Sequence, residues 1–204
     1  MSFNSGLITT GLKKAWAAFI ENVVALIVGL LITMIGSILI VTIAPLFYGF
    51  YYMCIKATRG EKVEIKDVFY GFKSLSVFIR SWIYFIIMIV IGIVLGIVMS
   101  LLNIIPYLGP IIGLILSIIL YVFLMFSIYI YIMKPNENVI YAIKESVNIA
   151  KDNFLMVLVV AIISYLLIVI GMLLIIVWLV TIPLAFAFDA YMLKELKPAI
   201  KDES

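Results

Sequence analysis

The sequence contains no histidine, one cysteine and few charges, and each shortage excludes a class of site. Without histidine and with only the thiol of Cys54, the chain has no His or Cys cluster to hold a metal and no pair to form an internal disulfide. The lack of histidine also excludes a Ser-His-Asp or Cys-His catalytic arrangement within the chain. We therefore expect no cofactor, no metal site and no enzymatic activity.

Charged residues make up 12% of the chain and apolar residues 67%, whereas a globular protein has about 25% and ~45–50%. The charges lie in four short stretches, separated by uncharged runs of 34, 53 and 36 residues at 22–55, 81–133 and 153–188. An uncharged apolar run of ~18 or more residues is typical of a membrane span. The sequence thus predicts an all-α integral membrane protein.

The basic residues indicate how the chain crosses the membrane. All Lys and Arg residues lie in the four charged stretches, and such stretches stay in the cytoplasm. If each uncharged run crossed once, the basic stretches would alternate between sides, whereas two crossings per run keep them together. We therefore predict six transmembrane helices in a prokaryotic cell (inner) membrane, with both termini cytoplasmic. A re-entrant hairpin is the alternative for the first run, which is short for two crossings of ~20 residues each.

Three similar units divide the chain. In the first and third, Asn22 corresponds to Asn153, where the chain enters the membrane, and Pro45 corresponds to Pro183, each 11 residues before a lysine. Each unit is predicted to be a short interfacial amphipathic helix followed by two membrane helices, with the cytoplasmic ends of membrane helices as the alternative for the short one. The predicted units with their membrane helices are 1–60 (18–37 and 39–58), 61–134 (80–102 and 109–133) and 135–204 (153–173 and 175–194).

Three polar residues are candidates for a cavity or ligand site: Asn22, Asn153 and Asp189. Asp189 is the only acid within the last apolar segment, where a carboxyl group can bind a ligand or carry a proton. The alternative is that it lies near the cytoplasmic surface, hydrated or paired with a lysine. The two asparagines either cap helices or face a common cavity. Pro45 and Pro183 are interpreted as helix kinks that improve packing, with a transporter binding site as the alternative.

Small residues recur at every fourth position in two neighbouring predicted helices: Gly92, Gly96 and Ser100, then Gly109, Gly113 and Ser117. Small residues at this spacing let helix backbones approach closely. They predict a packing seam between the third and fourth membrane helices, rather than a pore lining.

The most basic stretch joins the first two units. Its cations are expected to contact lipid head groups, because anionic lipids attract Lys and Arg, although topology alone would place them there too. These residues are Lys56, Arg59, Lys62, Lys66, Lys73 and Arg80.

Several short motifs are similar to those of a known family. They are Pro45 followed by Arg59-Gly60-Glu61 and by Asp67-Val68-Phe69-Tyr70-Gly71-Phe72-Lys73, then Ala142-Ile143-Lys144-Glu145-Ser146 with Asp152-Asn153, and Ile182-Pro183. Together they resemble an uncharacterised family of prokaryotic six-helix membrane proteins, akin to the membrane domain attached to some glycerophosphoryl diester phosphodiesterases. The resemblance implies a fold and a membrane location, and no activity, because the phosphodiesterase chemistry belongs to a separate soluble domain.

The sequence favours a non-enzymatic membrane component that binds lipid or a partner, which could be another membrane protein or a second copy of this chain. A small-molecule transporter, permease or channel subunit is the alternative, motivated by the paired prolines and the repeated units. An intramembrane enzyme is a third hypothesis. The net charge of +3 and the lack of an aromatic-basic reader motif argue against nucleic-acid binding.

Overall fold

The computed structural model describes residues 4–105, 107–173 and 175–198, and every regular element in these ranges is a helix. Pro106, part of the turn predicted in the second unit, lies outside the described residues. The elements are α1 (Ser5–Glu21), α2 (Val23–Gly36), α3 (Ile40–Thr58), the 3-10 helix η1 (Ile65–Phe72), α4 (Leu75–Leu102), α5 (Leu108–Leu124), α6 (Ser127–Met133), α7 (Val139–Asp152), α8 (Phe154–Leu173) and α9 (Ile175–Leu196).

Five helical segments are long and apolar enough to cross a membrane: Ile40–Thr58, Leu75–Leu102, Leu108–Met133, Phe154–Gly171 and Val177–Leu196. α1 and α2 meet this criterion only as a pair, and they are bent by 85° at their junction. The prediction of an all-helical chain is confirmed for the described residues, and the helices are compatible with a multi-pass membrane protein. The number of candidate spans is five, or six with the bent pair.

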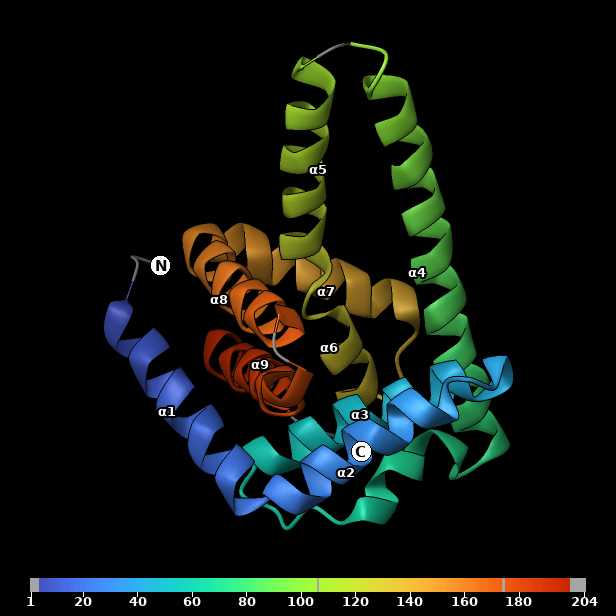
Figure 1. Cartoon of the computed structure of the whole chain (residues 1–204), viewed down its shortest axis with the longest axis vertical. Helices are drawn as coiled ribbons and strands as arrows, with labels where there is room; N and C mark the ends of the chain where they lie inside the picture. Colours follow the sequence, from blue (N-terminus) through green and yellow to red (C-terminus); the bar gives the residue numbers. More distant parts are fainter. Residues whose placement is uncertain (1–3, 106, 174, 199–204) are drawn as a thin grey trace.

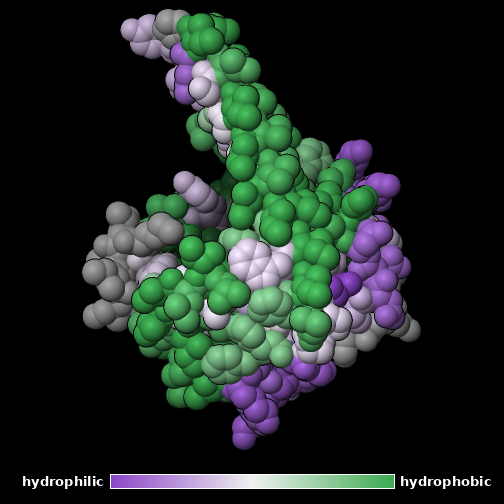
Figure 2. All heavy atoms as spheres, turned by 90° about the vertical axis from the view of Figure 1, so that its right-hand side faces the viewer, coloured by the Kyte–Doolittle hydropathy of each residue, from purple (hydrophilic) through white to green (hydrophobic). Residues whose placement is uncertain are grey.

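The helices form a body from which one long hairpin projects (Figure 1). α4 and α5 run side by side, and their distal halves stand clear of the other helices. In the body, α9 packs against α1, α3 and α8, while α2 and η1 pack against α3. Apolar side chains cover the projecting hairpin, whereas hydrophilic residues gather along the lower and right-hand edges of the body (Figure 2).

The core of the body explains why so much of the chain is uncharged. All seven residues of α6 are buried, although α6 is too short to cross a membrane by itself. Around it lie buried residues of α7, α8 and α9, and a second buried cluster joins α2 to α3. The apolar run from α5 into α6 therefore serves two purposes, with α5 on the hairpin and α6 in the core.

A further helix precedes each of the pairs α2–α3, α4–α5 and α8–α9, and these preceding helices are α1, η1 and α7. Asn4 caps α1 by accepting the Leu7 N–H at 3.2 Å, and Asn138 caps α7 by accepting the Tyr141 N–H at 2.8 Å. The middle short helix differs because it is a 3-10 helix that ends at Phe72, after which Ser74 caps α4. η1 packs closely on α3 over its eight residues.

Candidate functional site

Two glycines let η1 lie directly on the backbone of α3. A Cβ atom on Gly49 would lie 1.8 Å from the Val68 carbonyl oxygen, and one on Gly71 would lie 2.2 Å from the Pro45 carbonyl oxygen. Neither distance is compatible with a side chain. The motif residues around Pro45 and Gly71 therefore make one backbone-to-backbone contact between two elements that are distant in sequence.

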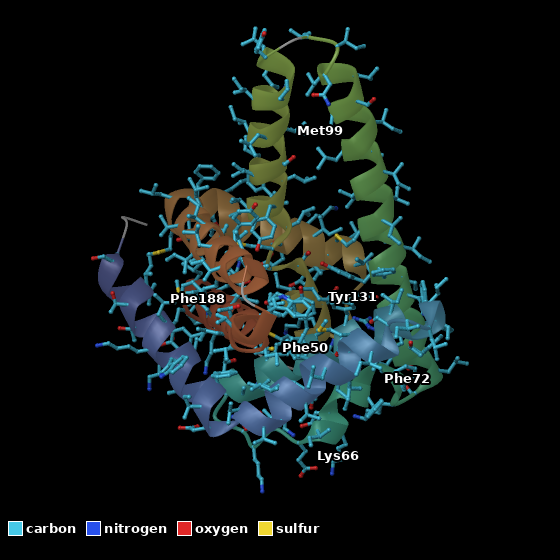
Figure 3. All side chains as sticks on the ribbon, viewed as in Figure 1. Phe50, Lys66, Phe72, Met99, Tyr131 and Phe188 are labelled. Carbon is cyan, nitrogen blue, oxygen red and sulfur yellow. The ribbon has the colours of Figure 1, made fainter. Side chains whose placement is uncertain are left out.

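Asp67 holds the same contact from its polar side. Its Oδ2 accepts the backbone N–H of Glu64 at 2.8 Å and pairs with the Lys56 ammonium at 2.8 Å, so the start of η1 is tied to the end of α3. Next to it, the Lys66 ammonium lies 2.5 Å from Glu64 and lowers the pKa of that exposed carboxyl. Figure 3 shows Lys66 at the outer edge of the body.

Arg80 is half-buried, and its guanidinium group bonds to the protein itself. Its guanidinium donates to the carbonyl oxygens of Tyr131 and Glu137 at 2.9 Å and of Lys134 at 3.3 Å, and it stacks 4.0 Å from the Tyr131 ring. These bonds satisfy carbonyls around the end of α6 that the helix itself leaves open. In the structure, Arg80 ties α4 to α6.

The other basic residues of this stretch also have protein contacts. Lys73 lies 5.2 Å from the centre of the Tyr70 ring, Arg59 lies 3.6 Å from Glu61, and Lys62 lines a shallow hollow beside Asn22. Contact with lipid head groups stays a prediction for these side chains. It applies best to Lys66, whose side chain is 78% exposed.

Asn22 and Asn153 occupy equivalent junctions, α1–α2 and α7–α8. Their backbone angles are similar, with φ −121° and ψ 21° for Asn22 and φ −132° and ψ 35° for Asn153. In each, the amide Nδ2 donates to the carbonyl four residues earlier, on Ala18 at 3.0 Å and on Ile149 at 3.2 Å. Asn22 also accepts the Val63 N–H at 2.9 Å. Both side chains thus bond to the local backbone at a helix break.

A cavity of about 480 Å³ lies where the base of the α4–α5 hairpin meets the body. Its wall comes from six helices, α3, α4, α5, α6, α8 and α9, and from Met125 between α5 and α6. Most of the lining is apolar, but four tyrosines also face it: Tyr51, Tyr84, Tyr121 and Tyr129. Neither Asn22 nor Asn153 lines this cavity, so the three candidate residues do not share it.

Asp189 lines the cavity and is 4% exposed. The Ser164 hydroxyl, from α8, donates a short hydrogen bond to its Oδ1. Lys194 is exposed, and within the described part of the chain no basic side chain pairs with Asp189. The interpretation that Asp189 is hydrated at the surface or neutralised by a lysine is therefore wrong. Asp189 is five positions before Lys194, and this length of α9 places the carboxyl group in the core while the lysine stays exposed.

Tyr129 places a second polar atom beside this carboxyl group. Its side chain is 1% exposed, and its hydroxyl is near Asp189 without the geometry of a full hydrogen bond, so it has no partner. The ring meets Tyr51 edge-on at 5.2 Å, and Tyr51 stacks on Phe186 at 4.5 Å. Aromatic rings and the unpartnered Tyr129 hydroxyl thus lie beside Asp189 in the wall of the cavity.

The small residues of the hairpin divide into two groups. Gly109 and Gly113 of α5 face α4, because Cβ atoms there would lie 2.0 Å from the Leu102 carbonyl oxygen and 2.4 Å from the Met99 sulfur. Met99 lies between the two helices in Figure 3. Gly92 and Gly96 have nothing within 4 Å of the corresponding position. The predicted seam is therefore right for α5 and wrong for α4, where Gly92 lines the cavity instead.

Sequence reasoning identified Asp189 but missed Ser164 and the tyrosines. Tyr51, Tyr84, Tyr121 and Tyr129 all lie within uncharged runs, so each brings a polar hydroxyl into an apolar environment. That is the signal that could have marked them. Their convergence on Asp189 depends on the packing of α3, α4, α5 and α6, which no local pattern reveals.

Comparisons with known proteins found no relative of this chain. No family model, no curated protein and no solved structure matches the chain.

Proposed function

We propose that this protein is a non-enzymatic, multi-pass cell-membrane protein that binds an amphiphilic ligand, such as a membrane lipid, in the cavity at the base of the α4–α5 hairpin. The supporting observation is the lining of that cavity, which is apolar and aromatic except for the buried carboxyl group of Asp189 and a few hydroxyls. Ligand sites of ~300–1,000 Å³ have this character, with a few polar groups that fix the orientation of the ligand.

The shape of the cavity supports an elongated ligand. Along α4 the lining extends from Tyr84 to Leu95, which corresponds to ~16 Å of helix. Tyr51, Tyr84 and Tyr129 supply hydroxyls near the Tyr84 end, whereas the lining near Leu95 is mostly aliphatic, and the hydroxyl of Ser117 there is bonded to the Gly113 carbonyl of its own helix. A molecule with a polar head and an apolar tail would match both ends.

We also propose six membrane crossings in three two-helix units, with both termini in the cytoplasm. The matching backbone and side-chain bonds of Asn22 and Asn153 support the relation between the first and third units. The resemblance to six-helix prokaryotic membrane proteins agrees with this arrangement. α1 would lie in the membrane interface, where its bend of 85° to α2 brings the chain into the bilayer.

Native mass spectrometry of the purified protein tests ligand binding, with two matched variants. Gly92 lines the cavity and Gly96 does not, yet both have open space where a side chain would begin. We expect a lipid-sized adduct on the wild-type protein and on Gly96→Leu, and a several-fold weaker adduct on Gly92→Leu. Adducts of equal intensity on the two variants would overturn the proposed site. A leucine side chain inside the cavity would then affect ligand binding no more than one outside it.

A further inference from the structure

We infer that the ligand of this cavity carries a positively charged amine head group, either a protonated amine or a quaternary ammonium, on an apolar tail. This inference rests on the proposed function and specifies the ligand class. The observations that carry it are a buried carboxyl group without a counter-ion, an unpartnered hydroxyl beside it, and aromatic rings around both.

Asp189 lacks the partner that a buried carboxylate requires. Within the described residues Ser164 donates to its Oδ1, the Tyr129 hydroxyl lies close by, and no basic side chain pairs with this cavity-lining carboxyl group. By contrast, Glu61, Glu64, Asp67 and Glu145 do pair with basic side chains, and they lie in the charged stretches. An ionised carboxylate in an apolar interior is costly unless a cation or hydrogen bonds compensate for the lost water. A cationic ligand supplies that compensation.

The hydroxyl of Tyr129 points to the same kind of ligand. It is buried and has no hydrogen-bond partner, although it lies beside Asp189 in the wall of the cavity. A buried polar atom in a folded protein normally has a partner. A protonated amine can donate to the Asp189 carboxylate and the Tyr129 oxygen together, whereas an anionic or purely apolar ligand satisfies neither.

The aromatic lining favours a cation over an anion at this end. Tyr51, Tyr84, Tyr121 and Tyr129 face the cavity with Phe186, and no Lys or Arg lines it. The faces of such rings carry negative electrostatic potential and attract ammonium groups, including quaternary ones that cannot donate hydrogen bonds. The carboxylate and the rings therefore act on the same charge, and both would repel a phosphate or a fatty-acid carboxylate.

Binding of three probes with the same alkyl chain tests this inference. The probes are dodecyltrimethylammonium, uncharged dodecanol and anionic dodecanoate, measured by equilibrium binding to the full chain in phosphatidylglycerol discs, with empty discs subtracted. We expect the wild-type protein to bind the ammonium probe most tightly and dodecanoate least. Equal affinity for the three probes overturns the inference. This comparison needs no variant, so it stands even if a substitution impairs folding.

Asp189→Asn isolates the charge, because the amide keeps an oxygen acceptor for Ser164. We expect this variant to bind dodecyltrimethylammonium about tenfold more weakly or worse, and dodecanol as before. Asp152→Asn makes the same chemical change on an exposed residue and should leave both affinities unchanged. An Asp189→Asn protein that binds the ammonium probe as tightly as wild type overturns the inference.

Gly92→Leu separates this inference from the proposed function. It should weaken binding of every probe, because it fills the cavity, and Gly96→Leu should weaken none. If neither variant affects any probe, the cavity is not the site and the proposed function fails. If the wild-type protein binds the three probes with equal affinity and Gly92→Leu weakens the binding of each, the site stands and only the head-group inference fails.

The amine could belong to a lipid head group or to a free amphiphile. Discs that contain phosphatidylethanolamine distinguish these sources. Competition with dodecyltrimethylammonium supports binding of the lipid amine, whereas unchanged probe affinity supports a single-chain cationic amphiphile as the ligand.

Discussion

Pro45 removes one backbone hydrogen bond from α3, and a side chain from another helix replaces it. Proline has no N–H, so the Val41 carbonyl loses its donor four residues later along the helix. The indole Nε1–H of Trp82, on α4, donates to that carbonyl at 3.2 Å. A carbonyl without a donor is costly in a membrane, and a neighbouring helix is the usual remedy. At Pro45 the structure supports the packing interpretation.

Trp82→Phe tests this contact. The variant keeps an aromatic ring but loses the N–H, so we expect it to lower the free energy of unfolding by about 1 kcal/mol. Cys54 provides the measurement, because it is the sole cysteine, is fully buried, and reacts with a thiol dye only when the protein opens. In a Pro45→Ala background the alanine N–H can donate to Val41, and the same Trp82→Phe change should then cost less. Equal costs in the two backgrounds would show that the indole acts only through its bulk.

At the scale of elements, the contact between η1 and α3 holds the loop after the first hairpin. It depends on Gly49 and Gly71, which meet the backbone of the opposite element, and on Asp67, which joins Lys56 to the start of η1. Asp67 and Gly71 lie in the Asp67–Lys73 motif, whereas Gly49 and Lys56 belong to α3. These residues therefore fix how η1 docks on α3, and none of them lines the cavity beside Asp189.

Gly71→Ala should displace η1 from α3. The added methyl group would lie 2.2 Å from the Pro45 carbonyl oxygen, and backbone atoms cannot yield as a flexible side chain can. We expect a loss of about 1–3 kcal/mol, as for overpacking in a protein core, read from the temperature at which Cys54 becomes reactive. Gly96→Ala is the matched control, since nothing lies within 4 Å of its new methyl group, and it should be neutral or slightly stabilising. If Gly71→Ala is as stable as the control, η1 can shift away from α3 at little cost in stability.

Local signals in the sequence predicted that the chain is helical, but they did not predict the 85° bend at Asn22 within the expected helix 18–37 or the contacts between distant segments. A cap such as that of Asn138 on α7 is a local signal, because it involves residues only three positions apart. Arg80 was assigned to lipid head groups, but the carbonyls it binds lie 51 to 57 residues further along the chain. Asp189 was identified as unusual from its apolar context. Its burial, the serine that binds it and the tyrosines beside it follow only from how six helices pack.

At the scale of the whole molecule, the α2–α3 and α4–α5 hairpins differ in the length of their helices. α4 has 28 residues and is ~42 Å long, whereas α2 has 14 residues and is ~21 Å long. The hydrocarbon core of a bilayer is ~30 Å thick, so α4 can cross it with length to spare and α2 cannot cross it alone. α1 compensates if it lies within the interface, because α2 then begins below the head groups. Trp16 and Ile20, exposed on α1 near the bend, suit that position.

Labelling of single added cysteines at the hairpin tips tests whether both hairpins cross. Ile38, between α2 and α3, is 80% exposed and Tyr107, before α5, is 88% exposed, so a thiol at either tip is accessible to a reagent that reaches it. Cys54 is buried and should stay silent in the folded protein. With six crossings, a membrane-impermeant maleimide added to intact cells labels both Ile38→Cys and Tyr107→Cys, whereas Lys62→Cys reacts only in inverted vesicles. Labelling of Tyr107→Cys but not of Ile38→Cys from outside would make the first hairpin re-entrant. The 21 Å of α2 would then set its depth in the membrane, and the bend at Asn22 would mark the level at which it turns into the bilayer.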